Sequence, residues 1–490
     1  MVSKDRSKLF LLKTIGGVLL FAGAAFLRSR GFYTGSFLLF LFLLVTEASI
    51  FFLETRNILD LRLLLTLSWL GGLSLAVLNL SSLQQEWRLK MWFICGGFYF
   101  LTISGYEVLP YLKASFSEKR RKKAGPEERI LKEAVSETGT EGEDKTEGED
   151  RNKGPAPAEA IVTERVWQAL LILFGLILVS FMIESVKFGF VYPFMSDKPH
   201  AYTEFHITGI HYFVVSTPFI HAMSVWYLMK TDRAASGEQR YRKRLLLLIG
   251  INLVSVLIAV MILSKLQLFF SLVMSFSVWL LTNRRISRKK LFFLLAAGGA
   301  AFVVAAAAMI FLRKYPDQYL EGIFEFRNKE IPVAVQYPYM YVVNNFENLN
   351  LLTEDLTAFS LGKRILLPFL SLSGLKFIPA VRDFLSVPVF FTKPELTTLT
   401  VIYDVYGDFG AAGVYLFGLI LGMVSAAVQE KARKGGPGSV LLFSQLVIYF
   451  ALSFFSTWFS NPTVWYYFGL TFLIALWCRI PGKKRSAKAA

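Results

Sequence analysis

Residues 397–422 read TTLTVIYDVYGDFGAAGVYLFGLILG, and this stretch decides the fold. It starts with polar residues, carries the acids Asp404 and Asp408, and then becomes apolar through small residues. This order is typical of the outer mouth of a membrane helix. A long segment without a spanning run, residues 313–394, precedes it and is rich in Arg, Lys, Tyr and Asn. We therefore expect the segment and the helix mouth to build one site on the outer face of a membrane.

The composition predicts an all-α polytopic integral membrane protein. Of the 490 residues, 54% are hydrophobic, and many of them stand in uninterrupted apolar runs of about 20 residues. Soluble proteins of this length do not carry so many such runs. The apolar signal is continuous instead of alternating, which argues against a β-barrel.

About 12 apolar runs have the length that a helix needs to cross a bilayer, which is roughly 17 to 25 residues. They lie near 9–27, 35–53, 61–80, 91–112, 167–187, 210–229, 245–263, 266–282, 291–312, 408–428, 439–458 and 463–479. If the N-terminus is inside, every strongly basic short loop falls on the cytoplasmic side, in agreement with the positive-inside rule. Both termini are then expected to be cytoplasmic. The first apolar run is expected to be a retained helix and not a signal peptide.

The charge and cysteine content limit the classes of partner and cofactor. The net charge of +17 comes from 53 Lys and Arg against 36 Asp and Glu, and in a membrane protein such an excess marks cytoplasmic loops and not a nucleic-acid partner. Cys95 and Cys478 each stand within an apolar run, so no disulfide framework or cysteine-based metal site is expected. The sequence has no Walker-type phosphate loop, dinucleotide fingerprint or serine-hydrolase elbow.

These features divide the chain into six parts. They are an N-terminal four-helix membrane part (1–112), a charged cytoplasmic loop (113–163), central membrane helices (164–312), a large outer loop (313–396), C-terminal membrane helices (397–480) and a basic cytoplasmic tail (481–490). The cytoplasmic loop has few apolar side chains and contains TEGED twice, which predicts a disordered linker, with a regulatory role as the alternative. Short apolar patches in the outer loop, at 364–381, suggest interfacial or re-entrant helices.

Basic residues on the outer side suggest an anion site. Lys265 stands in a hairpin between two apolar runs, where it either serves a site or extends to the lipid headgroups. The outer loop carries Arg313, Lys314, Arg327, Lys329, Lys363, Arg364, Lys376, Arg382 and Lys393. Arg and Lys match phosphate oxygens, whereas each residue taken alone is more simply explained as solvated charge. For the cluster as a whole we favour anion binding.

Histidines and acids near the outer face are candidate proton-transfer groups. His206 and His211 are expected at the outer end of the run 210–229, where a histidine can act as a general base. Their spacing fits no common metal-ligand motif. Asp404 and Asp408 are four residues apart, so a helix places them on one face. They can orient a hydroxyl, act as a base or pair with the outer cations, or they can simply cap the helix.

Three stretches together resemble a known family. The stretch YDVYGDFGAAGVYLFGLILG (403–422) resembles the D-F-G-x-x-G signature near the end of bacterial oligosaccharide repeat-unit polymerases, the Wzy-type O-antigen and capsule polymerases. YPYMYVVNNFENLNLL (337–352) resembles the Tyr- and Asn-rich outer segment of that family, and VMILSKLQLFFSLV (260–273) resembles its span-turn-span. The resemblance covers most of the chain from about residue 165 onward. Where the family usually carries Arg in this hairpin, the chain has Lys265, which keeps the charge and loses the bidentate geometry.

The resemblance implies an integral-membrane glycosyltransferase of the GT-C type in the bacterial inner membrane. Such an enzyme transfers a growing glycan from undecaprenyl pyrophosphate to the next lipid-linked repeat unit at the outer face, with no metal, nucleotide or other cofactor. Its expected partners are membrane lipid, a chain-length regulator and a flippase of the same pathway. In this reading the pyrophosphate-binding residues are Lys265, Arg313, Arg327, Lys363 and Arg364. The catalytic groups are His211, Asp404 and Asp408, and the sugar-binding residues are Tyr337, Tyr339, Tyr341 and Tyr403.

Three other functions remain open from the sequence. An O-antigen ligase has similar chemistry and differs in its acceptor. A lipid-linked oligosaccharide flippase or a small-solute transporter makes no new glycosidic bond and has broken helices around a substrate path at the midplane. A scaffold of an envelope-assembly complex tolerates the removal of charge in its outer loop.

Overall fold

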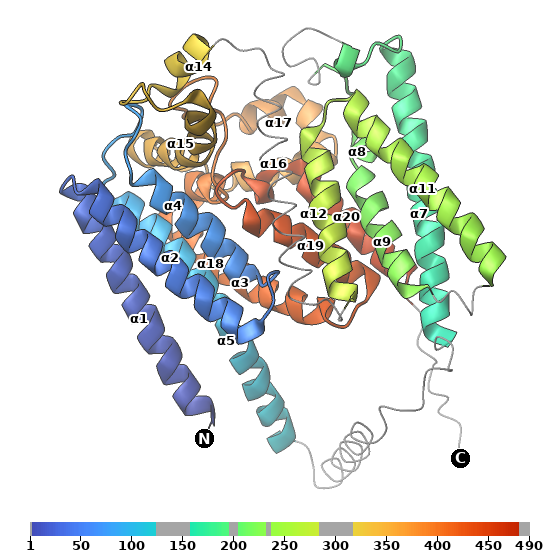
Figure 1. Cartoon of the computed structure of the whole chain (residues 1–490), viewed down its shortest axis with the longest axis horizontal. Coiled ribbons are helices and arrows are strands. Elements are labelled where there is room, and N and C mark those ends of the chain that lie inside the picture. Colours follow the sequence, from blue (N-terminus) through green and yellow to red (C-terminus); the bar gives the residue numbers. More distant parts are fainter. Residues whose placement is uncertain (1, 124–156, 196–203, 232–236, 284–316, 480–490) are drawn as a thin grey trace.

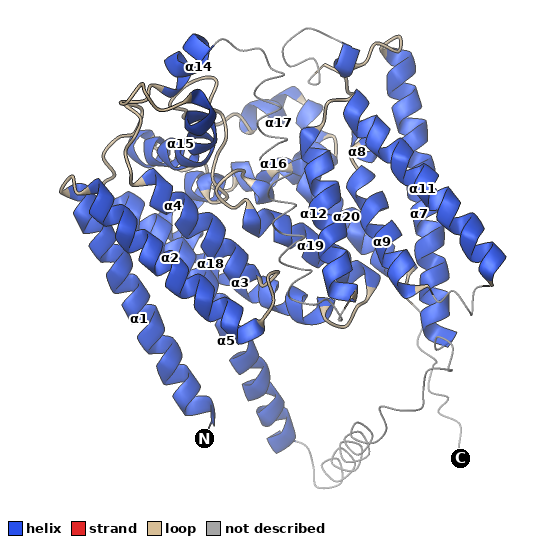
Figure 2. Cartoon of the chain, viewed as in Figure 1, coloured by secondary structure: helices blue, strands red, loops and turns tan. Residues whose placement is uncertain are grey.

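The computed structural model describes residues 2–123, 157–195, 204–231, 237–283 and 317–479. In this part of the chain the regular elements are helices (Figure 2), and one isolated β-bridge joins Ser81 to Phe326. Seven of the described helices are long and apolar enough to cross a membrane. The expectation of an all-helical protein that passes through a membrane several times is confirmed at this level.

The long apolar helices provide the frame of the molecule. They are α1 (Val2–Ser29), α2 (Tyr33–Thr55), α5 (Leu89–Lys123), α7 (Pro157–Lys187), α11 (Glu238–Met261), α12 (Lys265–Thr282) and α18 (Tyr403–Ala432). Shorter helices between them are α3 (Leu61–Leu65), a π-helical turn (Thr66–Leu70), α4 (Gly71–Ala76), α8 (His211–Val214), α9 (Thr217–Lys230), α19 (Pro437–Ala451) and α20 (Pro462–Trp477). Short 3₁₀ turns lie at Pro193–Met195, Leu375–Phe377 and Trp458–Ser460.

Four further helices form the segment that the sequence assigns to the outer face. They are α14 (Asp317–Phe324), α15 (Val333–Asp355), α16 (Lys363–Leu372) and α17 (Pro379–Phe384). They gather at one end of the bundle, beside the start of α18, whereas α1 begins at the opposite end (Figure 1). Short helices are therefore present at 364–381, where the sequence suggested them.

Of the twelve predicted spans, 291–312 lies outside the described residues and the other eleven contain helices. Three of these are shorter or more broken than predicted. The run 61–80 is helical only to Ala76 and includes the π-helical turn, and the run 439–458 ends its helix at Ala451. The run 210–229 divides into α8 and α9, because Pro218 has no backbone N–H and takes the first turn of a new helix.

The borders of the cytoplasmic loop are also different from those predicted. Helix α5 continues to Lys123 and α7 begins at Pro157, so both ends of the predicted disordered loop 113–163 are helical. The sequence there is rich in Lys, Arg, Glu and Ala, which have high helix propensity and extend a helix past its apolar part. Residues 124–156 lie outside the described residues.

Helices α5 and α18 approach each other through glycines, and this contact joins the first and last parts of the chain. A Cβ added at Gly422 would lie 2.0 Å from the carbonyl oxygen of Thr102, and one at Gly105 would lie 2.2 Å from that of Leu419. Small residues allow such close backbone contact between membrane helices, where packing replaces the hydrophobic effect as the driving force. The stretch 397–422 therefore owes its position to glycines on its own helix and on α5.

Candidate functional site

Helix α18 is interrupted close to its start, at the glycine of the D-F-G stretch. Gly410 has φ 63° and ψ −156°, a backbone conformation that is essentially restricted to glycine. The interruption frees two carbonyl groups of the preceding turn. Those of Gly407 and Asp408 accept the N–H groups of Ser360 and Leu361 at 2.9 and 3.1 Å. The D-F-G stretch is therefore the joint between a membrane-spanning helix and the outer segment.

The carboxylate of Asp408 is fully buried in this joint and its oxygens are occupied. Oδ1 accepts hydrogen bonds from the hydroxyl of Ser360 and from the backbone N–H of Arg364, and Oδ2 accepts the N–H of Ile365 at 2.9 Å. These amides belong to the first turn of α16, so Asp408 caps a helix other than its own. Its environment favours a positioning role over that of the catalytic base suggested by the sequence.

Arg364 is buried beneath the outer segment and makes three contacts through its guanidinium group. Nη1 lies 3.2 Å from Oδ1 of Asp404, Nε donates to the hydroxyl of Ser360, and Nη2 donates to the carbonyl of Pro388. Gly407 leaves room for this group, because a Cβ there would lie 2.5 Å from Nε. Arg364 thus holds α18, α16 and the segment before α18 together.

Asp404 is less buried than Asp408. Its side chain is 15% exposed, whereas Asp408 is 0% exposed. Besides Arg364, the hydroxyls of Thr457 and Ser460, which stand between α19 and α20, lie near its carboxylate. Both acids face Arg364 and its helix, as their spacing of four residues suggested. Of the two, Asp404 is the one that is partly exposed, so it is the better candidate for proton transfer.

Tyr403 holds the segment 388–392 and is itself buried. Its hydroxyl accepts the N–H of Phe390 at 2.8 Å and lies 3.2 Å from the carbonyl oxygen of the same residue, to which it donates. Further along, the backbone N–H of Thr392 donates to Oδ1 of Asn348 at 2.8 Å. Tyr403 therefore fixes the backbone of this segment by hydrogen bonds. This role differs from the direct sugar contact that the resemblance implied.

Helix α15 carries a row of polar side chains into the interior. The buried members of this row include Asn344, Asn345, Glu347, Asn348 and Asn350. The side-chain amides of Asn344 and Asn348 both donate to the carbonyl of Leu396, at 3.1 and 2.8 Å. The Asn-rich outer stretch thus fixes the chain before α18 by hydrogen bonds to its backbone.

Glu347 connects α15 with the first part of the chain. It accepts the indole N–H of Trp87 at 2.9 Å and the backbone N–H of Gln85 at 3.2 Å, and Nη2 of Arg28 lies 4.0 Å away. Burial raises the pKa of Glu347 to about 7, although the charge of Arg28 opposes this rise. The sequence did not predict this junction of Glu347 with Gln85, Trp87 and Arg28, which lies next to the candidate site.

The other three tyrosines that the resemblance assigned to sugars lie on α15. Tyr339 is buried, its hydroxyl donates to Oε1 of Gln84 at 2.8 Å, and burial raises its pKa. Tyr337 and Tyr341 are partly exposed and stack with ring centroids 4.6 Å apart. Tyr341 also stacks on Phe455, which precedes α20. Of the tyrosines assigned to sugars, Tyr337 and Tyr341 are the partly exposed ones, and their rings pack on each other, on Phe324 and on Phe455.

His211 forms a second cluster with a buried acid. Its Nδ1 lies 3.0 Å from Oε1 of Glu184, and Glu184 also accepts the N–H of Ile207 at 2.8 Å. Glu184 is fully buried, whereas the side chain of His211 is 27% exposed. A carboxylate on Nδ1 orients the ring and leaves Nε2 for proton transfer. Glu184 stands within the apolar run 167–187, and no local pattern in the sequence pairs it with His211.

Helix α20 lies between the two clusters. Trp465 packs on Phe369 of α16 with ring centroids 4.5 Å apart, and Tyr466 stacks on Tyr212 of α8 at 5.2 Å. Among the described residues, His211 shares no hydrogen bond or ion pair with Arg364 or Asp404. The structure thus places the predicted catalytic groups on either side of α20.

The cations predicted to bind pyrophosphate contact different parts of the protein. Arg327 donates from its backbone to Leu80 and from Nε to Asn79, beside the Ser81–Phe326 bridge. Nζ of Lys363 lies 4.8 Å from the ring centre of Phe384. Lys265 is the first residue of α12, and Arg313 lies outside the described residues. Of the described cations, Arg364 is the one joined to the predicted acids.

The described residues contain no group of three or more His, Cys, Asp and Glu side chains that could hold a metal ion. Comparison with protein-family models, with curated proteins and with solved structures finds no significant match.

Proposed function

We propose that this protein is a membrane glycosyltransferase of the bacterial inner membrane. It polymerises undecaprenyl-pyrophosphate-linked oligosaccharide repeat units at the outer face, in the biosynthesis of a surface polysaccharide. The proposal combines the resemblance of residues 403–422, 337–352 and 260–273 to repeat-unit polymerases with the arrangement of the outer segment around α18.

The observation that carries the proposal is the buried ion pair between Arg364 and Asp404 at the mouth of α18. A buried pair is costly to desolvate, so it is retained where it positions groups for a purpose or specifies one arrangement. Here Asp404 lies in the stretch that resembles the polymerase signature, and Arg364 of α16 joins the outer segment to that stretch.

In the proposed reaction, the bond between the anomeric carbon of the donor sugar and the pyrophosphate oxygen breaks. The acceptor hydroxyl oxygen forms the new bond to that carbon, its proton passes to a base, and undecaprenyl pyrophosphate leaves with the bonding electrons. Asp404 and the His211–Glu184 pair are the two candidate bases. The guanidinium of Arg364 is 3% exposed and its contacts already use three of its five N–H bonds, so its role in this proposal is to position Asp404 and the outer segment.

A flippase is the second candidate, and one observation favours it. The helical runs at 210–229 and at Gly410 are both interrupted, as is common where a membrane protein binds a substrate between helices. The interruption at Gly410 is close to the start of α18, which supports an outer-face site in preference to a path at the midplane. An O-antigen ligase would be distinguished from a polymerase by the molecule that accepts the transferred glycan.

The test is the length of the surface glycan in cells that lack the protein and carry a plasmid-borne copy. We expect single repeat units in the null strain, long chains with the wild type, and short chains with Arg364→Ala or Asp404→Asn. Arg382→Ala and Asp383→Asn serve as matched controls, because both residues are exposed on α17. Membrane levels of every variant are measured by immunoblot. Unchanged chain length in the null strain contradicts the proposal, and accumulation of units on the cytoplasmic face points to the flippase.

A further inference from the structure

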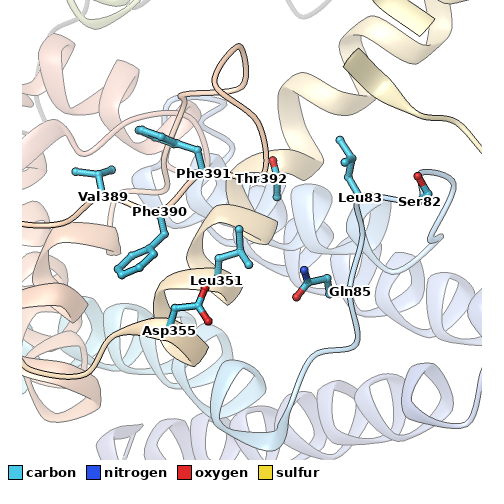
Figure 3. A pocket seen from close by; sticks show the side chains of 9 residues that line it. All are labelled: Ser82, Leu83, Gln85, Leu351, Asp355, Val389, Phe390, Phe391 and Thr392. Atoms are coloured by element: carbon cyan, nitrogen blue, oxygen red, sulfur yellow. The ribbon is translucent and has the colours of Figure 1, made fainter. Parts of the chain in front are cut away.

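A pocket of about 490 Å³ opens in the outer part of the molecule, beside the joint at α18. It lies between the turn that precedes α5, the end of α15 and the segment 389–392. The lining residues are Ser82, Leu83, Gln85, Leu351, Asp355, Val389, Phe390, Phe391 and Thr392. Figure 3 shows Phe390, Leu351 and Asp355 on one side and Leu83 and Gln85 on the other. The volume is in the range of small-molecule sites, about 300 to 1,000 Å³.

The wall formed by 388–392 is held by side chains that the sequence marked as functional. Arg364 binds the carbonyl of Pro388, and Tyr403 binds both backbone groups of Phe390. From α15, Asn348 accepts the backbone N–H of Thr392, and Asn344 accepts its hydroxyl. These residues surround the pocket without lining it, so their common effect is to fix its shape. A preformed wall reduces the entropy that a ligand loses on binding.

The opposite wall is also fixed. The N–H of Ser82 donates to the carbonyl of Glu325 at 2.9 Å, next to the Ser81–Phe326 bridge. The N–H of Gln85 donates to Glu347 at 3.2 Å. The backbone on both sides is therefore set by hydrogen bonds, and the side chains of Gln85 and Asp355 are among those that line the pocket (Figure 3).

The lining lacks any Lys or Arg. Of the nearby cations, Arg88 lies 2.8 Å from Glu354, Lys393 lies 2.5 Å from Glu325, and Nζ of Lys90 donates to the carbonyl of Thr353 at 2.7 Å. A phosphate in the pocket would meet the carboxylate of Asp355, and no cation of the lining would offset that charge, so the pocket does not suit an anion. Its polar groups are one carboxylate, one amide and two hydroxyls, and its apolar groups include two phenyl rings.

We propose that this pocket is a carbohydrate subsite that binds one neutral sugar ring. The rings of Phe390 and Phe391 cover the C–H face of the sugar, and Asp355 and Gln85 bind its hydroxyls. A carboxylate accepts from two neighbouring hydroxyls, and an amide both donates and accepts, which matches the edge of a pyranose. That the sugar belongs to the acceptor repeat unit rests on the proposed function, whereas the binding of a sugar in this pocket does not.

The direct test is binding of oligosaccharide to the purified full-length protein in detergent. The probe is the oligosaccharide fraction released by mild acid from the surface polysaccharide of the source cells, and binding is measured by saturation-transfer NMR and by titration of tryptophan fluorescence. Asp355→Ala is the central variant, because Asp355 is exposed at the end of α15 and its replacement leaves the described hydrogen bonds intact. We expect a Kd at least about tenfold weaker, as for the loss of a charged hydrogen-bond acceptor.

Phe391→Ala provides a second variant, since its side chain lines the pocket and is 36% exposed. Asp383→Asn is the control for the loss of an exposed carboxylate outside the pocket, and its Kd is expected to match that of the wild type. Thermal unfolding of each variant in the same detergent verifies folding. Wild-type protein that fails to bind the probe, or variants that bind it as tightly as the wild type, overturn the proposal. Binding of spermidine in place of the sugar, lost in Asp355→Ala, also overturns it and assigns the pocket to an organic cation.

The same variant separates this inference from the proposed function. If Asp355→Ala weakens binding and the null strain still makes chains of normal length, the subsite stands and the polymerase is wrong. If the null strain makes single units and Asp355→Ala binds the probe normally, the polymerase stands and the subsite is wrong.

Discussion

Asp408 supplies the cap for the helix that carries Arg364. Its Oδ1 accepts the backbone N–H of Arg364 at 3.1 Å, and the two residues are 44 positions apart in the sequence. The carboxylate thus acts on the backbone of the arginine, while the guanidinium group turns to Asp404. Asp408 therefore controls the orientation of Arg364. Replacement of Asp408 is expected to affect the Arg364–Asp404 ion pair, although Asp408 does not contact the guanidinium group.

Replacement of Asp408 by Ala is expected to destabilise the protein strongly. The change leaves the N–H groups of Arg364 and Ile365 without their acceptor, while the hydroxyl of Ser360 retains the carbonyl of Gly407 as an acceptor. Unsatisfied buried groups cost about 1 to 3 kcal/mol each when they cannot reach water, so a loss of roughly 2 to 6 kcal/mol is expected for the two N–H groups. Thermal unfolding in detergent measures it, with Asp383→Ala as the control. A melting temperature equal to that of the control contradicts the capping role.

Replacement of Gly410 by Ala tests the interruption of α18. A Cβ there would stand 2.7 Å from the ring of Phe359, and the backbone conformation disfavours any side chain. The strain costs about 1 to 3 kcal/mol in addition to the contact. The double variant with Phe359→Ala removes the contact and retains the strain, so it is expected to recover part of the stability. Gly469→Ala, with open space around its Cβ, is the helical control. Full recovery in the double variant shows that the backbone of Gly410 is unstrained.

Replacement of Gly422 by Ala is expected to separate α5 from α18. The added Cβ would stand 2.0 Å from the carbonyl oxygen of Thr102, and neither backbone can yield without a shift of the helix. We expect a lower yield of folded protein and a lower melting temperature. The free energy of unfolding is expected to fall by about 2 kcal/mol or more. Gly175→Ala on α7 is the control, because nothing lies within 4 Å of its Cβ. Equal stability of the two variants rules out this contact as a determinant of the fold.

Glu347 is expected to make stability depend on pH. The folded protein retains the proton up to a pKa of about 7, whereas the unfolded chain loses it near 4.5. The folded state therefore binds more protons between these values, and stability falls as pH rises from about 4.5 to about 7. The full effect is on the order of 3 kcal/mol. Glu347→Gln should flatten this slope in thermal unfolding, while Glu354→Gln, on the same helix and paired with Arg88, should retain it. A slope that persists in Glu347→Gln assigns the pH dependence to another group.

The helices could be predicted from the sequence, because a run of apolar residues is a local signal. That signal located α1, α2, α5, α7, α11, α12 and α18. It missed the interruptions at Gly410 and before Pro218, since each depends on a single residue within a run that remains apolar. The spacing of Asp404 and Asp408 correctly suggested a shared face, because a helical period relates residues within one element.

The site was less predictable because it is assembled from distant segments. Arg364 reads as an outer-loop cation, and its burial follows from contacts with residues 360, 388 and 404 that no local pattern encodes. The Asn-rich stretch 344–350 is polar enough to suggest exposure, yet it is buried, and the amides of Asn344 and Asn348 bind the carbonyl of Leu396. The pocket combines residues from 82 to 392, so only the folded chain reveals it.

The break at Gly410 also defines where this protein can be recombined with a relative. Residues 403–409 lie beyond the break and give their carbonyl and carboxylate groups to Ser360, Leu361 and α16. By these hydrogen bonds residues 403–409 are part of the outer segment, although they are continuous in sequence with the apolar part of α18. A chimera that exchanges the outer segment at the membrane border would cut through this joint. A chimera with its junction at Gly410 exchanges the outer segment together with residues 403–409, which form hydrogen bonds with it.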